Sequence, residues 1–156
     1  MIRLVIPGAS ELLLSHAVFD LNGTLAVDGK LVDGVAPRLS ALSEHLECIL
    51  ASADTNQSLA ATAQALRVEA RRVDCGSDKA SLLAELRRTG ALGIVAVGNG
   101  RNDAEMFRAC TLAIAVVGAE GVSGEALLEA DVVCTSPVDA LDLLLHPLRL
   151  VSTLRP

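Results

Sequence analysis

The sequence has almost no aromatic residues: of its 156 residues, two are Phe and none is Tyr or Trp. It also has no basic stripe, since 13 basic residues are outnumbered by 19 acidic ones and the net charge is −6. Nucleic-acid binding generally needs clustered cations for the phosphates or aromatic rings on which bases stack. We therefore expect no nucleic acid among the partners of this protein.

Cysteine is sparse, and its spacing does not fit a zinc site or a disulfide framework. Cys48, Cys75, Cys110 and Cys134 are spread evenly and form no C-x-x-C pair. We expect each to be a small buried apolar residue in a reducing compartment. The sequence also has no apolar stretch near the ~20 residues of a membrane span and no secretory signal pattern. It therefore predicts a cytoplasmic protein without membrane contacts.

Aliphatic residues dominate what is present. Hydrophobic residues make up 51% of the chain, and a chain of this length (1–156) is expected to fold as one domain without cross-links. Apolar runs alternate with segments of helical spacing, which is typical of an α/β domain: three layers, Rossmann-like, with a central, mainly parallel sheet. Strands are expected near 47–52, 68–74, 92–98, 112–116 and 131–134, and helices near 35–46, 56–66 (capped by Asp54 or Thr55), 78–88, 102–109, 124–130 and 136–146.

Two hairpins are expected near the start of the chain. The runs "RLVIPG" and "ELLLSHAVFDL" read as two strands around a Pro-Gly-Ala-Ser turn, giving an N-terminal hairpin over about residues 2–19. Further on, Asp28-Gly29 stands between two short apolar arms. This dipeptide is a strong signal for a two-residue turn, so we expect a small β-hairpin flap over about residues 25–33.

Four polar clusters follow predicted strands, at the edge where open α/β sheets bind ligands. A carboxylate at a strand end can attack phosphorus in line if cations and hydrogen-bond donors neutralise the phosphoryl oxygens. Asp20 is placed to be that nucleophile, and Gly23 lets backbone N–H groups approach a phosphate. The clusters are Asp20-Leu-Asn22-Gly23-Thr24, Ser52 in "ILASADT", Lys79 in "GSDKASLL", and Asn99-Gly-Arg-Asn102-Asp103.

The order and residue types of these clusters resemble the four motifs of the haloacid dehalogenase superfamily of phosphatases and phosphotransferases, over roughly residues 17–135. The flap-only layout and "GNGRND" are most similar to the small soluble relatives of P-type ATPases. The resemblance implies a fold without a cap domain, because the segments between the motifs are too short to hold one. It also implies an aspartyl phosphate on Asp20 as the reaction intermediate.

The resemblance further implies roles for individual residues. Ser52 and Lys79 would bind the phosphoryl group, Lys79 would also hold the nucleophile, and Thr24 would orient the phosphate loop. The metal would be Mg²⁺, which prefers oxygen ligands. Its ligands would be Asp20, the backbone carbonyl of Asn22, and side-chain oxygens of Asn99 and Asp103, with Asn102 supporting the loop.

Two asparagines depart from the superfamily pattern, which has aspartate at both positions. At Asn22 the family aspartate works as a general acid and base, a role that an amide cannot take over, so turnover is expected to be slow. Asn99 can still offer an oxygen to Mg²⁺ but brings no charge. We therefore expect weak metal binding.

Two functions stay open at this point. The first is a slow Mg²⁺-dependent enzyme, a phosphatase or an ATPase-like phosphotransferase, acting on a phosphorylated small molecule or protein. The second is a binding or regulatory module that keeps the fold and turns nothing over. A site without a cap would be open, and a neighbouring subunit could close it, which makes a homo-oligomer a candidate assembly.

Overall fold

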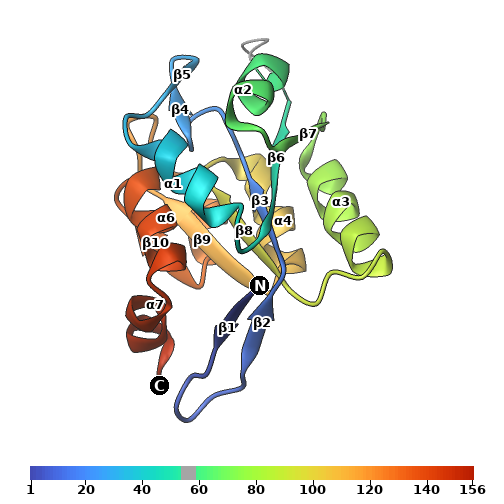
Figure 1. The fold of residues 1–156 in the computed structure, drawn as a ribbon. Coiled ribbons are helices and arrows are strands. Elements are labelled where there is room, and N and C mark those ends of the chain that lie inside the picture. Colours follow the sequence, from blue (N-terminus) through green and yellow to red (C-terminus); the bar gives the residue numbers. More distant parts are fainter. Residues whose placement is uncertain (54–58) are drawn as a thin grey trace.

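The computed structural model describes residues 1–53 and 59–156. Its centre is a six-stranded sheet with the order β10-β9-β8-β3-β6-β7 (Figure 1). Every neighbouring pair in this sheet is parallel, in agreement with the predicted fold class. The strands are β3 (His16–Phe19), β6 (Glu47–Ser52), β7 (Glu69–Arg72), β8 (Ile94–Gly98), β9 (Leu112–Val116) and β10 (Val132–Cys134).

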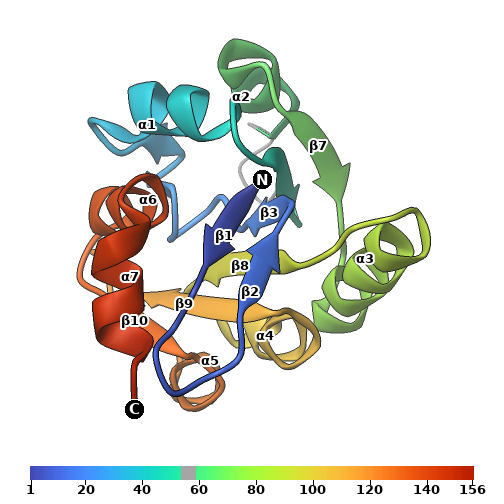
Figure 2. The same ribbon diagram turned by 60° about the horizontal axis from the view of Figure 1, so that its bottom comes forward.

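Helices cover both faces of the sheet, which gives three layers (Figures 1 and 2). Each face has its own apolar cluster, to which the helices of that face contribute. On one face lie α1 (Val35–Leu42), α2 (Leu59–Leu66) and α6 (Pro137–Leu145), followed by α7 (Pro147–Leu154), which packs against β1 (Ile2–Leu4). On the other lie α3 (Gly76–Arg88), α4 (Ala104–Ala109), which follows the 3-10 turn η1 (Arg101–Asp103), and α5 (Gly124–Leu128).

The central strands divide their side chains between the two clusters. In β8, Val95 and Val97 belong to one cluster, whereas Ile94 and Ala96 belong to the other. Strands buried on both faces read as continuous apolar runs instead of alternating ones. This is why "GIVAVG" and "LAIAV" are apolar throughout.

The N-terminal hairpin is present, but the predicted second strand is divided into two. Strand β1 pairs antiparallel with β2 (Leu12–Leu14), and β3 begins after Ser15. At Ser15 the chain changes partner, because the backbone N–H groups of Ser15 and His16 both donate to the carbonyl of Gly93. The hairpin therefore projects from the amino end of β3, away from the flap (Figure 1).

The flap has the predicted form and position. Strands β4 (Ala26–Val27) and β5 (Lys30–Leu31) pair antiparallel across Asp28 and Gly29. Both turn residues have positive φ, 50° and 74°, as a type I′ hairpin turn requires. The flap lies beyond the carboxyl end of β3 (Figure 1), and no cap domain is inserted between the strands of the part of the chain that is described.

Some details differ from the sequence prediction. Helix α7 was not expected; it begins at Pro147, directly after α6, with Pro147 in its first turn. Cys48 and Cys134 are buried and Cys110 is half-buried, whereas Cys75, the N-cap of α3, is exposed, so the prediction of burial is wrong for Cys75. The proposed caps of α2, Asp54 and Thr55, lie outside the described residues. Among the helices of residues 1–53 and 59–156, none has the length and apolar character needed to cross a membrane.

Candidate active site

The four polar clusters meet at the carboxyl end of the sheet. Asp20 follows β3, Ser52 ends β6 and Asn99 follows β8, and these three strands are neighbours in the sheet. The meeting point is a cavity of about 240 Å³. It is lined by Asp20, Asn22, Ser52, Ala53, Asn99, Gly100, Asn102 and Glu120.

Lys79 joins two carboxylates beneath this cavity. Its Nζ donates to Asp20 Oδ1 at 2.7 Å and to Asp103 Oδ1 at 2.5 Å. Lys79 and Asp103 are fully buried, and Asp20 is 5% exposed. Burial alone would lower the pKa of the Lys79 ammonium, but the two carboxylates more than offset this and raise its pKa above the ordinary value. The ammonium therefore stays charged, and the three side chains form a buried cluster with one excess negative charge.

The fold positions Lys79 through the first turn of α3. Asp78 Oδ2 accepts hydrogen bonds from the backbone N–H groups of Asp74 and Cys75, which fixes the start of the helix. Gly76 lets this turn approach the predicted metal loop, residues 99–103, because a Cβ on Gly76 would lie 3.0 Å from the backbone oxygen of Asn102. The glycine of "GSDK" therefore brings Lys79 close to Asp103.

Asp103 is held from two sides. Its Oδ1 accepts from Lys79, and its Oδ2 accepts from the backbone N–H groups of Asn99 and Gly100 at 2.9 and 2.8 Å. Gly98 is required beside it, since a Cβ on Gly98 would lie 2.4 Å from the Asp103 carboxyl carbon. In this arrangement Asp103 shapes the loop and anchors Lys79, and its role as a metal ligand stays a prediction.

The hydroxyl of Thr24 lies between Asp20 and Asn99. Its Oγ1 is 3.1 Å from Asp20 Oδ2 and 2.9 Å from Asn99 Oδ1, and the side chain is 1% exposed. The amide of Asn99 is oriented from the other end, where its Nδ2 donates to the carbonyl of Gly121. Thr24 thus orients the loop, and it ties the predicted nucleophile to the predicted metal loop.

Asn22 faces the second strand of the site. Its Nδ2 donates to Ser52 Oγ at 3.3 Å, and Ser52 is 2% exposed. Asn102 is exposed and lines the cavity from the metal-loop side. The structure therefore brings all the predicted polar positions to one end of the sheet.

Gly23 provides space rather than a phosphate-binding N–H group of its own. Its N–H donates to the carbonyl of Ala26 at 2.7 Å, within the flap. Its φ of +79° disfavours other residues, and a Cβ would lie 2.7 Å from Asn99 Nδ2 and 3.0 Å from Glu120 Oε2. The amide of Asn99 and the carboxylate of Glu120 therefore pack closely over Gly23.

Glu120 is the cavity residue that sequence reasoning missed. It lies in the loop between β9 and α5, and its Oε1 accepts from the backbone N–H of Asp28 in the flap turn at 3.1 Å. The available signal was topological: strand β9 ends at the same edge of the parallel sheet as β3 and β8. The acidic residue of "GAEG" after that strand was therefore a candidate for the same site.

The candidate metal donors are all oxygens, which suits a hard cation such as Mg²⁺. Asp20 and Asn99 line the cavity, and their oxygens share the Thr24 hydroxyl. Among the described residues, no group of three or more His, Cys, Asp or Glu side chains gathers as a metal cluster. The donor set thus fits an oxygen-liganded cation held by few protein charges.

Burial makes the charge of Asp20 unfavourable. Desolvation and the negative charge of Asp103 raise the pKa of Asp20 from 3.8 to about 6, against the opposing effect of Lys79. The folded protein therefore binds a proton on the Asp20 carboxylate more tightly than the unfolded chain does. The resulting stabilisation is present below about pH 4 and is lost as the pH rises through 6.

We therefore expect Asp20→Asn to stabilise the metal-free protein by about 1–3 kcal/mol near pH 8, because the neutral amide leaves Lys79 and Asp103 as a balanced pair. Urea unfolding in EDTA measures this difference, which should vanish below about pH 4. Asp33→Asn, at an exposed position, is the control and should change little. If Asp20→Asn is instead destabilised by the same amount near pH 8 and below about pH 4, the raised pKa of Asp20 is contradicted.

No family model matches the chain. The uncharacterized protein MJ0073 of Methanocaldococcus jannaschii is 40% identical over 78 residues, covering 49% of this chain and 84% of that protein. The chain belongs to the same family as this archaeal protein.

Solved structures show which fold it has. A protein of Streptomyces avermitilis assigned to the HAD family hydrolases matches with a TM-score of 0.68 at 21% identity, over 84% of this chain and 88% of the other. The 3-deoxy-D-manno-octulosonate 8-phosphate phosphatase of Moraxella catarrhalis, in complex with magnesium, phosphate and KDO, matches with a TM-score of 0.71 at 13% identity, over 85% and 86%. The chain has the haloacid dehalogenase (HAD) fold.

The HAD fold of this chain is also shared with P-type ATPases. A zinc-transporting PIB-type ATPase matches with a TM-score of 0.66 at 22% identity. The match covers 79% of this chain but 20% of the ATPase, so the similarity concerns one part of that larger protein. The predicted resemblance to the HAD superfamily and to P-type ATPases is thereby confirmed at the level of the fold.

Proposed function

We propose that the protein is a Mg²⁺-dependent phosphoryl-transfer enzyme, a phosphatase or an ATPase-like phosphotransferase, that works through an aspartyl phosphate on Asp20. The observation that carries the proposal is the buried bridge from Lys79 to Asp20 and Asp103 beneath a polar cavity. Proteins of known structure with this fold include a phosphatase complex with magnesium and phosphate. They support the class of reaction but do not identify the substrate.

The proposed chemistry gives each of these side chains a role. A carboxylate oxygen of Asp20 attacks phosphorus, the bond from phosphorus to the leaving oxygen breaks, and water later releases phosphate from Asp20. Lys79 and Thr24 contact different oxygens of Asp20 and so fix the orientation of the carboxylate. Ser52 lies at the cavity wall and would donate a hydrogen bond to a phosphoryl oxygen. Mg²⁺, held by oxygens of Asp20, Asn22 and Asn99 and by Asp103 as the further predicted ligand, would supply positive charge to the phosphoryl oxygens.

Asn22 is the reason that we propose slow turnover. Its side chain faces Ser52 and the cavity, but an amide, unlike a carboxylate, cannot serve as a general acid or base. A binding or regulatory module on the same fold is the second candidate, and it is favoured by Asn22 and Asn99, which replace aspartates of the superfamily pattern. The two functions differ in whether substrate is turned over.

A panel of phosphorylated metabolites with Mg²⁺ tests the proposal directly. We expect release of phosphate from at least one compound by the wild-type protein and none by Asp20→Asn. If the wild-type protein binds phosphate compounds in a thermal-shift assay but releases no phosphate from any of them, the binding-module function is the better account.

Asn99→Asp should tighten Mg²⁺ binding, because it adds a charged oxygen next to Asp20. Without metal, the change removes the hydrogen bond to the Gly121 carbonyl and lowers stability. We therefore expect a larger rise of the melting temperature on adding Mg²⁺, and half-maximal activity at a lower Mg²⁺ concentration. Asn102→Asp adds the same charge three residues further along the same loop and serves as the control. A Mg²⁺ response that is the same in both variants would remove Asn99 from the ligand set.

A further inference from the structure

We infer that Glu120 is a general base and acid of this site and takes over part of the role of the carboxylate that Asn22 lacks. The inference rests on the proposed function and adds a catalytic residue to it. Among the described residues that line the cavity, Asp20 and Glu120 are the two carboxylates. Asp20 is the nucleophile, so the proton-transferring role falls to Glu120.

The loop that carries Glu120 is fixed against both sides of the site. In this loop, between β9 and α5, the carbonyl of Gly121 accepts from Asn99 Nδ2 at 3.0 Å, and the N–H of Ser123 donates to the carbonyl of Asn99 at 2.8 Å. Gly118 packs on the other side, where a Cβ would lie 3.4 Å from the Gly23 carbonyl oxygen. The backbone around Glu120 is therefore anchored to the loop that follows Asp20 and to the predicted metal loop that begins at Asn99.

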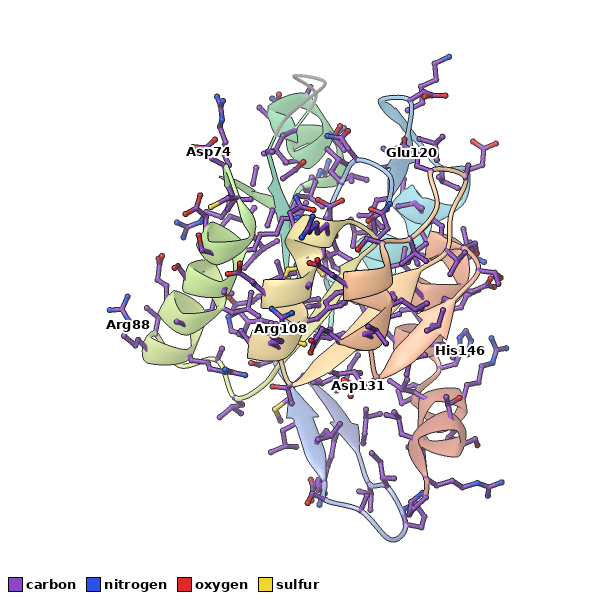
Figure 3. All side chains as sticks on the ribbon, turned by 180° about the vertical axis from the view of Figure 1, so that it is seen from behind. Asp74, Arg88, Arg108, Glu120, Asp131 and His146 are labelled. Atoms are coloured by element: carbon purple, nitrogen blue, oxygen red, sulfur yellow. The ribbon has the colours of Figure 1, made fainter. Side chains whose placement is uncertain are left out.

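The two oxygens of the Glu120 carboxylate have different surroundings. Oε1 accepts from the Asp28 N–H of the flap turn, whereas Oε2 lies over Gly23, where a Cβ would be 3.0 Å from it. The side chain is exposed and lies at the end of the molecule that carries the flap (Figure 3). One oxygen thus orients the group, and the other can exchange a proton with water or with a leaving group in the cavity.

The proton balance of the reaction closes with this residue. When water attacks the phosphorus of phosphorylated Asp20, the new P–O bond forms, the bond from phosphorus to the Asp20 oxygen breaks, and Glu120 takes the proton of the water. The products are phosphate, ionised Asp20 and protonated Glu120. In the next cycle Glu120 returns this proton to the leaving oxygen of the substrate, as a positioned acid–base group does.

The test compares the wild-type protein with Glu120→Gln, using p-nitrophenyl phosphate and Mg²⁺. The glutamine oxygen can still accept from the Asp28 N–H, so the flap contact is kept while proton transfer is lost. p-Nitrophenolate leaves without help from an acid, so the first step does not need Glu120. The variant should be slowed in the second step, in which water attacks phosphorylated Asp20. We expect steady-state turnover to fall by about 10²–10⁴-fold and the fraction of chains with phosphate on Asp20 after an acid quench to rise.

Two further variants keep the test specific. Glu129→Gln removes a carboxylate that pairs with Arg108 outside the cavity and should behave like the wild-type protein. Glu120→Asp keeps a carboxylate and should retain part of the activity that Glu120→Gln loses. Turnover of Glu120→Gln within about threefold of wild type, without accumulation of phosphorylated Asp20, would overturn the inference. A raised Mg²⁺ requirement with unchanged turnover at saturating Mg²⁺ would also overturn it, by making Glu120 a metal ligand.

The outcome for the wild-type protein separates this inference from the proposed function. Turnover and phosphorylated Asp20 in the wild-type protein, together with an unaffected Glu120→Gln variant, contradict the role of Glu120 alone. If the wild-type protein shows no turnover and no phosphorylated Asp20, the proposed function and the role of Glu120 are both contradicted.

Discussion

Replacing Asn22 by Asp is expected to raise phosphoester turnover, because it restores a carboxylate at the cavity wall beside Ser52. The gain should be largest in the Glu120→Gln background, where it should approach the ~10²–10⁴-fold that a positioned acid–base group contributes. In the wild-type background it should be smaller, since Glu120 already transfers the proton. Steady-state rates with p-nitrophenyl phosphate at saturating Mg²⁺ measure both gains.

The control for this prediction concerns the wild-type sample. Asn22 and Asn99 both precede glycine, a sequence prone to deamidation, so ageing could create the same aspartates in the wild-type protein. Intact mass must therefore be checked before each assay. If Asn22→Asp leaves turnover unchanged in both backgrounds, although Mg²⁺ and phosphate still bind, the absence of an acid at position 22 is not the cause of slow turnover.

Replacing Lys79 by Met is expected to destabilise the fold by about 3–5 kcal/mol near pH 8, the usual effect of removing one partner from a buried ion pair. The variant leaves Asp20 and Asp103 buried side by side without their shared cation. Turnover should be lost as well. Urea unfolding of the metal-free protein measures the change in stability.

The chain offers a matched control and a double variant. Lys30→Met removes the other lysine of the chain, which is exposed in the flap, and should change stability little. Adding Asp20→Asn to Lys79→Met removes one of the two uncompensated carboxylates and should recover more stability than Asp20→Asn gains in the wild-type background, a non-additive result expected for groups in contact. Additive effects of the two changes would show that the bridge does not couple these residues.

The sequence predicts the fold well because most of its elements carry local signals. Continuous apolar runs mark β6, β8 and β9, and Asp28-Gly29 marks the flap, where the backbone must adopt positive φ. The division between β2 and β3 was not predictable, because Ser15 changes strand partner through contacts with Gly93, which is far away in the sequence. The predicted end of the last helix near residue 146 agrees with the end of α6, but helix α7 was missed, although Pro147 stands in its first turn, a position that proline favours.

The candidate site was predictable where a residue ends a strand, as Ser52 does, or directly follows one, as Asp20 and Asn99 do. Lys79 was found through its resemblance to a known motif, and the structure explains its position through the close approach of Gly76 to Asn102. Glu120 was missed because its contacts, to Asp28 and over Gly23, join segments that are far apart in the sequence. The saturation of both Asp103 oxygens was hidden for the same reason: the donors are Lys79 and two backbone N–H groups.

The measurement that tests the central claim most directly is the detection of covalent phosphate on Asp20. Wild-type protein is incubated with p-nitrophenyl phosphate and Mg²⁺, quenched in acid, and analysed by intact mass and peptide mapping, with Asp20→Asn as the control. The account predicts one added phosphoryl group, located on Asp20, that is absent from Asp20→Asn and more abundant in Glu120→Gln. Steady turnover without any phosphate on Asp20, or equal turnover in Asp20→Asn, would contradict it.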